Sequence, residues 1–338
     1  MTKVIHTLVP TTPHGNPCGS YGGYGETSSD LDTLAQLRKP SNDGGYTEGQ
    51  KSYQKRARAK AITNAVVYKM VDVASPLNKS YWSSWHCSRA VLQDGNKITS
   101  RYCNQRWCLV CNRIRTAKLM NGYLPALGNM VNPQFVTLTV PNVDGAELKV
   151  TIETMTKTFR QCLDVMRKRG VTPDGIRKSE VTVNEVTQLY HPHFHLIVDG
   201  EDNANDIVKL WLAHNPNSSP IAQDVRPCTD AKELFKYFTK LLTKSGQFLP
   251  VHMDVIFQAM KGKRVYQPFG TVRKVSEDVD ATEAVTCDWK APQDEIWVYE
   301  DAAEFSDWYN STGEALTEVV HSAQTMALIE VINARAPT

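Results

Sequence analysis

The sequence predicts an α+β fold in which helices pack against a central antiparallel β-sheet. Three observations predict it: β-branched or alternating segments, amphipathic segments with helical spacing, and the order in which the two kinds follow one another. With 338 residues and 41% hydrophobic content, the chain can bury a large core. We see no signal-peptide pattern before Pro17 and no run of roughly 18 apolar residues. We therefore expect a soluble cytoplasmic protein with no membrane partner.

Composition divides the chain into four regions. Residues 1–50 are rich in Gly, Ser, Thr, Asn and Pro, which predicts a flexible N-terminal tail. Residues 51–125 should form a basic helix and a cysteine-containing module, and residues 126–275 the central α+β domain. Residues 276–338 are acidic, and we expect a C-terminal appendage there. The net charge of +2 means that any nucleic-acid interface must depend on local charge clusters.

A helix is predicted from Lys51, in the segment "KSYQKRARAKAITNAVVYKMV". Its basic cluster is either a solvated helix face or a phosphate contact, and the residues leave both interpretations open. Strand-like pieces on both sides of "QDGN" predict a tight hairpin. Another helix should begin near Asn112.

Four of the eight cysteines lie close together, at positions 87, 103, 108 and 111. Disulfides are unexpected in the cytosol, whereas four thiolates suit a tetrahedral structural zinc ion. We therefore predict a Zn²⁺ site formed by Cys87, Cys103, Cys108 and Cys111, with His86 as a possible replacement for one sulfur. Several basic residues near these cysteines predict a phosphate-binding surface, namely Arg101, Arg106, Arg113, Arg115 and Lys118.

The central domain shows strands and helices in a clear order. A strand is predicted over 133–143, and an amphipathic helix over 147–169 that stops before Gly170. "KSEVTVNE" and "HFHLIV" should pair as a hairpin. Further helices are expected over 202–214 and 230–244, followed by a short helix within 251–275.

The segment "HPHFHLIV" places histidines at alternate positions. In a strand, His193 and His195 project from one face about 7 Å apart, a spacing that two ligands of one metal ion can share. A histidine-rich strand edge without an ion has the same pattern.

In the predicted helix over 230–244, Glu233 and Tyr237 are four residues apart and share a face, with Lys236 and Lys240 beside the tyrosine. Alone, this pattern describes a surface tyrosine with a glutamate neighbour. Together with a metal held by imidazoles, it suggests a tyrosine hydroxyl that attacks phosphorus. The lysines would favour the phenolate and hold the phosphate.

The segments "FVTLTVPNV", "HPHFHLIV" and "ELFKYFTK", in this order, resemble the three motifs of the HUH endonucleases. They are most similar to rolling-circle replication initiator (Rep) proteins of small plasmids, of the single-tyrosine type. "RYCNQRWCLVCNRIR" also resembles the family's cysteine signature, with leucine where proline is usual. The resemblance covers about residues 80–275 and implies the HUH endonuclease fold for residues 126–275.

The resemblance also implies roles for individual residues. His193 and His195 would bind Mg²⁺ or Mn²⁺, with Glu180 as the third ligand and Glu185 as the alternative. His191 is expected not to be a ligand. Tyr237 would be the nicking nucleophile, and Glu233 would activate water or replace a second tyrosine at termination. The expected DNA contacts are Lys236, Lys240, Arg106 and Arg113.

The implied activity is that of a site-specific single-strand DNA endonuclease and strand transferase. It would nick one strand at a plasmid origin, keep the 5′ phosphate on tyrosine and leave a 3′ hydroxyl for a host polymerase. Its expected partners are single-stranded or hairpin origin DNA and a host helicase and polymerase. The same centre would rejoin ends at termination.

Other functions share parts of the pattern. Amidohydrolases and metallo-β-lactamase-like hydrolases also contain HxH, but they need further ligands that the chain lacks near His195. A zinc-stapled, sequence-specific DNA-binding protein without nicking activity would need the histidines only for structure. A relaxase or transposase of the HUH group would share the chemistry.

Overall fold

The computed structural model describes residues 48–94, 97–235, 246–279, 285–286, 295–301 and 306–333. Seven α-helices are described in these ranges: α2 (Glu48–Val71), α3 (Asn78–His86), α4 (Leu109–Gly128), α5 (Gly145–Lys168), α6 (Glu201–His214), α7 (Pro250–Met260) and α8 (Ala323–Asn333). Two 3-10 helices are η1 (Pro220–Ala222) and η2 (Ala231–Phe235). Of the expected tail over 1–50, only 48–50 fall within the described residues, and they begin α2.

The strands form two five-stranded sheets. The first has the order β10-β9-β1-β2-β8 and the second β6-β3-β5-β4-β7, and every recorded pair is antiparallel. The first sheet contains β1 (Ala90–Asp94), β2 (Lys97–Ser100), β8 (Val285–Thr286), β9 (Glu295–Glu300) and β10 (Asp307–Tyr309). The second contains β3 (Pro133–Thr139), β4 (Gly175–Val183), β5 (Tyr190–Asp199), β6 (Asp224–Pro227) and β7 (Tyr266–Phe269). The predicted α+β class is confirmed.

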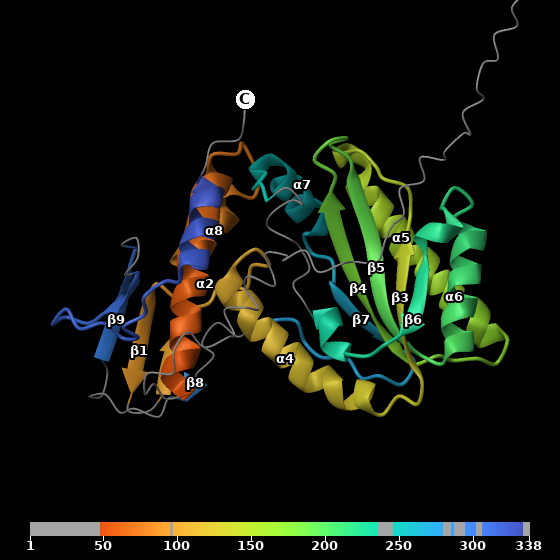
Figure 1. Cartoon of the computed structure of the whole chain (residues 1–338), viewed down its shortest axis with the longest axis horizontal. Coiled ribbons are helices and arrows are strands. Elements are labelled where there is room, and N and C mark those ends of the chain that lie inside the picture. The colour runs from red at the N-terminus through yellow and green to blue at the C-terminus, as the bar shows by residue number, and fades with distance from the viewer. Residues whose placement is uncertain are drawn as a thin grey trace, which may run out of the picture.

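Helices α5 and α6 pack on one face of the second sheet (Figure 1). Phe194 of β5 points into this layer and contacts the rings of Phe159 in α5 and Trp211 in α6. Burying such a side chain contributes about 1.5–3 kcal/mol. The other face carries Phe135 and Ile197, which belong to the core shared with α4 and η2. Helices α5 and α6 therefore cover one face of the second sheet, and α4 and η2 pack against part of the other face.

The end of α5 shows how local sequence sets an element boundary. Gly170 has a φ of +81°, a conformation that glycine adopts without a steric penalty. The amide of Val171 donates to the carbonyl of Met166 at 3.0 Å, and that of Gly170 to Arg167 at 2.9 Å. These two bonds form a Schellman motif, which satisfies carbonyls that the helix end would leave unpaired. The predicted stop before Gly170 is confirmed.

The predicted hairpin between "KSEVTVNE" and "HFHLIV" is also confirmed. β4 and β5 pair from Gly175–Val198 to Val183–Tyr190, and Asn184 to Leu189 form the connecting turn. The register places Glu180 directly opposite His193. It thereby fixes which side chains share the face that α5 and α6 leave free.

The C-terminal region, which we expected to be an appendage, lies beside the cysteine-containing module (Figure 1). β9 pairs with β1, and α8 packs against α2. Trp297, Tyr299 and Trp308 join Val91 and Ile98 in one buried cluster. A two-stranded hairpin cannot bury its apolar face alone, so these C-terminal strands complete its sheet. We accordingly propose that the described parts of 276–338 and 51–125 form one module.

Candidate metal centre and cysteine cluster

Two strands, β4 and β5, bring the candidate metal ligands to one face of the second sheet, and β3 lies beside them. Side chains directly opposite each other in antiparallel strands share a face. Glu180 of β4 lies opposite His193 of β5, and Lys178 of β4 lies opposite His195. On the other side of β5, Thr137 of β3 pairs with His195. The pairing of β4 with β5 therefore brings the carboxylate of Glu180 and the ammonium of Lys178 to the same face as the two histidines.

Glu180, His193 and His195 form a compact group. Their potential ligand atoms all lie within 4.8 Å of one another. The Nε2 atom of His193 is 4.0 Å from Oε1 of Glu180, and Nε2 of His195 is 3.9 Å from Oε2. Two imidazoles and one carboxylate around this space could hold a divalent metal ion.

Neighbouring groups orient both imidazoles. Nδ1 of His193 is 3.0 Å from the carbonyl oxygen of His191, which can only accept, so Nδ1 carries the proton. Nδ1 of His195 is 3.2 Å from Oγ1 of Thr137. A neutral imidazole that donates through Nδ1 keeps its Nε2 lone pair for a metal. The outer contacts therefore fit the ligand role of both rings.

The electrostatic environment keeps Glu180 and His195 deprotonated at neutral pH. Burial alone would raise the pKa of Glu180, but the charge of Lys178, followed by those of His193 and His195, outweighs it and sets the pKa at about 2. Burial, with the charge of His193, lowers the pKa of His195 to about 3. At neutral pH, a metal would therefore displace no proton from Glu180 or His195.

The other candidates near this hairpin lie elsewhere. Glu185 is in the turn between β4 and β5, where its carbonyl accepts a hydrogen bond from Gln188, and it lies outside the group formed by Glu180, His193 and His195. Nδ1 of His191 lies 2.8 Å from Oδ1 of Asn142, and its ring stacks on His193 at 5.0 Å. His191 thus supports the His193 ring, and the strand continues through Pro192.

The predicted helix over 230–244 is described only at its start. Residues 231–235 form the 3-10 helix η2, in which Glu233 is exposed. Tyr237, Lys236 and Lys240 lie outside the described residues, so the structure places none of them. The neighbouring Phe235 is buried against the site's sheet: it stacks on Tyr266 of β7 at 5.5 Å and on Tyr123 of α4 at 6.1 Å. Tyr266 lies opposite Lys178 in the register.

The four predicted cysteines form a second compact group. Cys87, Cys103, Cys108 and Cys111 have sulfurs within 4.8 Å of one another. The sulfur of Cys111 is 3.5 Å from that of Cys87 and 3.6 Å from that of Cys103. Backbone amides of Cys103 and Gln105 donate to the sulfurs of Cys87 and Cys103, both at 3.4 Å. Four converging sulfurs with amide donors could hold a metal ion. His86 is exposed and outside this group.

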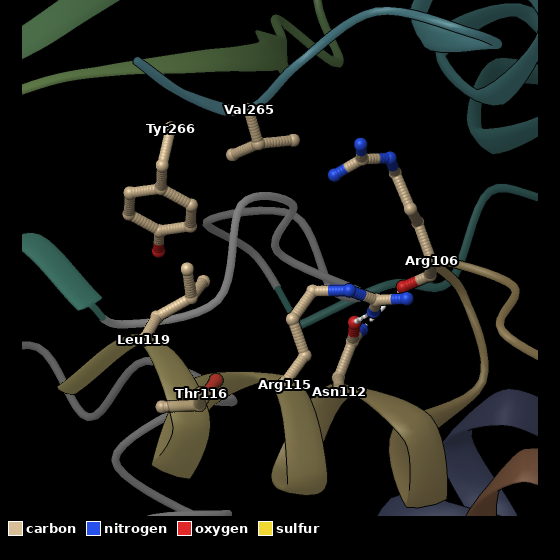
Figure 2. Close-up of a pocket in the computed structure, with 7 residues that line it drawn as sticks. All are labelled: Arg106, Asn112, Arg115, Thr116, Leu119, Val265 and Tyr266. Carbon is tan, nitrogen blue, oxygen red and sulfur yellow. Dashed lines mark hydrogen bonds between the residues drawn. The ribbon is translucent and has the colours of Figure 1, made fainter. Parts of the chain in front are cut away.

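Arg106, which we expected to contact DNA, makes contacts within the protein. Its guanidinium pairs with Glu277 at 2.7 Å and donates to the carbonyl of Lys263 at 2.9 Å. Figure 2 shows its main chain beside Asn112 and Arg115 of α4, around a cavity of about 20 Å³. Such a volume holds about one water molecule. Arg113, the other candidate, is partly buried near Arg58, whose pKa is lowered first by burial and then by the charge of Arg113.

Lys178 is the site residue that our sequence analysis missed. It is buried and donates to Oε2 of Glu180 at 2.8 Å. The available signal was its position two residues before Glu180, which puts both side chains on one strand face.

No helix among the described residues is long and apolar enough to cross a membrane.

In comparisons with known proteins, residues 96–201 match a family model described as "Replication protein". A Protein rep of Streptococcus pneumoniae serotype 2 is 30% identical over 103 residues, which are 29% of this chain and 32% of the relative. A Protein rep of Staphylococcus aureus is 31% identical over 102 residues, or 28% of this chain and 44% of the relative. A Protein rep of Lactiplantibacillus plantarum is 26% identical over 213 residues, which are 53% of this chain and 66% of the relative.

These matches span from about a third to two thirds of the relatives' own length. No solved structure matches. The region matched by the family model contains Glu180, His193, His195 and three of the four clustered cysteines, and it ends before Tyr237. Residues 96–201 of this chain are therefore similar to replication proteins of the Rep type.

Proposed function

We propose that this chain initiates rolling-circle replication of a plasmid by nicking one DNA strand at the origin. The observation that carries the proposal is the convergence of Glu180, His193 and His195 on one sheet face, within the region that matches the replication-protein family model. A Mg²⁺ or Mn²⁺ ion bound there would neutralise charge on the scissile phosphate. We propose Zn²⁺ for the cysteine cluster, where it would stabilise the fold.

In this proposal, Tyr237 is the nucleophile. It follows Phe235 by two residues, and an extended chain spans at most about 3.5 Å per residue. Phe235 stacks on Tyr266, and Tyr266 lies opposite Lys178, the partner of Glu180. The last residue described before Tyr237 therefore packs on the sheet that carries the proposed metal site. Lys236 and Lys240 would hold the phosphate on either side of it, and Glu233 would activate water at termination.

The proposed reaction is a transesterification. The phenol oxygen of Tyr237 loses its proton and forms a bond to phosphorus, while the bond from phosphorus to the 3′ oxygen breaks. The 3′ oxygen takes up a proton and leaves as the hydroxyl that a host polymerase extends, with a host helicase opening the duplex. The tyrosine ester keeps the energy of the broken bond, so the reverse reaction can rejoin ends.

The test is incubation of the full chain and Mn²⁺ with labelled single-stranded oligonucleotides tiled across the plasmid that encodes it. The wild type and Tyr309→Phe, a control in the other sheet, should form a protein–DNA adduct that survives denaturant. Tyr237→Phe should form none, and Glu180→Gln little. If the wild type forms no adduct on any strand, the proposal is wrong, and a DNA-binding protein without nicking activity becomes the better interpretation.

A further inference from the structure

A group of aromatic and basic side chains lies on the surface beside the cysteine cluster. We call it the Trp82–Trp85 surface, and its members are Tyr68, Trp82, Trp85, His86 and Arg89. Trp82 is 41% exposed and Tyr68 is 43% exposed. Tryptophan is highly buried on average, so an exposed indole beside other rings suggests a binding surface.

The rings contact one another in a defined arrangement. Trp82 and Trp85 meet edge to face, with centroids 6.1 Å apart, and Trp85 meets His86 in the same way at 4.9 Å. Nε1 of Trp85 donates to the hydroxyl of Tyr68 at 3.1 Å. The guanidinium of Arg89 lies 4.2 Å above the ring of Trp85. One face of Trp85 is therefore covered by a cation, while Trp82 keeps much of its surface open to solvent.

The cysteine cluster anchors this surface. Helix α3 carries Trp82, Trp85 and His86, and it ends immediately before Cys87. The thiol of Cys103 is 3.6 Å from the hydroxyl of Ser84, and the buried Lys60 donates to the carbonyl of Trp85. Closing the cysteine cluster around a metal would therefore fix the positions of the rings as well.

The surrounding chain has the charge that a nucleic acid requires. Between Asp72 and Asp144, Asp94 is the single acidic residue, against eight lysines and arginines. Two of these, Arg106 and Arg115, are engaged within the protein, and the other six still outnumber Asp94. Open aromatic faces within a basic segment match the chemistry of single-stranded DNA, whose bases can stack on rings while cations contact its phosphates. Bases in a duplex are already stacked on each other and do not offer the same faces.

We propose that the Trp82–Trp85 surface binds single-stranded DNA, with a base stacked on Trp82 and a phosphate held by Arg89. The inference deepens the proposed function, on which it rests for DNA as the partner. The cysteine module then has a direct role in binding, because it holds the exposed strand of the origin at a second point, away from the metal centre. Because stacking tolerates any base, this contact adds affinity without reading the sequence.

The test measures binding of a fluorescent oligothymidylate of roughly 20 nucleotides to the full zinc-loaded chain by anisotropy, without Mn²⁺. Trp82→Ala should weaken binding by about 5- to 150-fold, the loss expected for one stacked base. Trp82→Tyr should retain most of the affinity. Ile221→Ala, which removes an exposed apolar side chain beside the other sheet, should bind like the wild type. Zinc content and circular dichroism should be unchanged in all three variants.

Two results would overturn the inference. If Trp82→Ala binds oligothymidylate like the wild type, the surface does not stack bases, and a protein partner would be the better occupant. If Trp82→Ala weakens duplex binding as much as single-strand binding, the effect is not base stacking. The probe has no origin sequence and the assay needs no cleavage. Failure of the nicking proposal would therefore appear in the adduct assay and leave this binding intact.

Discussion

Lys178 donates a hydrogen bond to Glu180 at 2.8 Å, and both side chains are buried. The pair joins two residues on one face of β4, and Glu180 uses its other oxygen toward His193. A buried carboxylate without a metal needs a cation to offset the loss of hydration. Lys178 meets that need, but the same charge repels a second cation. At the proposed metal site, Lys178 would therefore stabilise the metal-free protein at some cost in metal affinity.

Replacing this lysine tests the balance. We expect Lys178→Met to destabilise the metal-free protein by about 3–5 kcal/mol, because it leaves a buried carboxylate unpaired. We also expect Mn²⁺ to bind at least about tenfold more tightly, since a repelling charge is gone. Urea unfolding and Mn²⁺ titration measure the two effects. Equal stabilisation of variant and wild type by Mn²⁺ would show that the lysine does not oppose the metal.

The two glutamates considered as third ligand can be separated by a matched pair of variants. Glu180→Gln removes the carboxylate that faces both imidazoles and should weaken Mn²⁺ binding by about 100-fold, the upper end for loss of a group that tunes a metal site. Glu185→Gln changes a residue in the hairpin turn and should leave binding unchanged. Electron paramagnetic resonance of free Mn²⁺ gives both affinities. If Glu185→Gln weakens Mn²⁺ binding and Glu180→Gln does not, Glu185 is the third ligand.

The sequence could predict the hairpin, α5 and its stop at Gly170 because each depends on local patterns of apolar residues and on glycine. It also grouped the histidines and the cysteines correctly. It could not predict that β9 pairs with β1, because strands about 200 positions apart leave no local signal. The sequence could not predict the ion pair between Arg106 and Glu277 for the same reason, because the two residues are far apart in the sequence and meet only in the folded protein.

The cysteine cluster predicts a selective response to substitution. Cys108→Ser should abolish tight binding of one zinc equivalent and lower stability strongly, because metal binding and folding are coupled. Cys162→Ser is the matched control, since Cys162 is equally buried but lies in α5, outside the cluster. Metal content after dialysis and the thiolate bands of the Co²⁺-loaded protein report the site. Loss of metal from the α5 variant would refute a site confined to these four cysteines.

His321 predicts how stability depends on pH. It is 5% exposed, and neither ring nitrogen has a hydrogen-bond partner among the described residues. Burial, helped by the charge of Arg58, lowers the pKa of His321 from 6.5 to about 4. Between these values the unfolded chain holds a proton that the folded chain lacks. The contribution of His321 is therefore complete above pH 6.5 and is lost as the pH falls toward 4.

His321→Leu should remove this part of the acid sensitivity. One proton accounts for a slope of at most about 1.4 kcal/mol per pH unit, and the variant should lose up to that slope between the two pKa values. An apolar side chain also leaves no buried imidazole unpaired, so the variant should be at least as stable as the wild type near pH 5. Urea unfolding at several pH values measures the slope. His214→Leu, at an exposed site on α6, is the control, and an unchanged slope in His321→Leu would show that this imidazole does not govern the acid response.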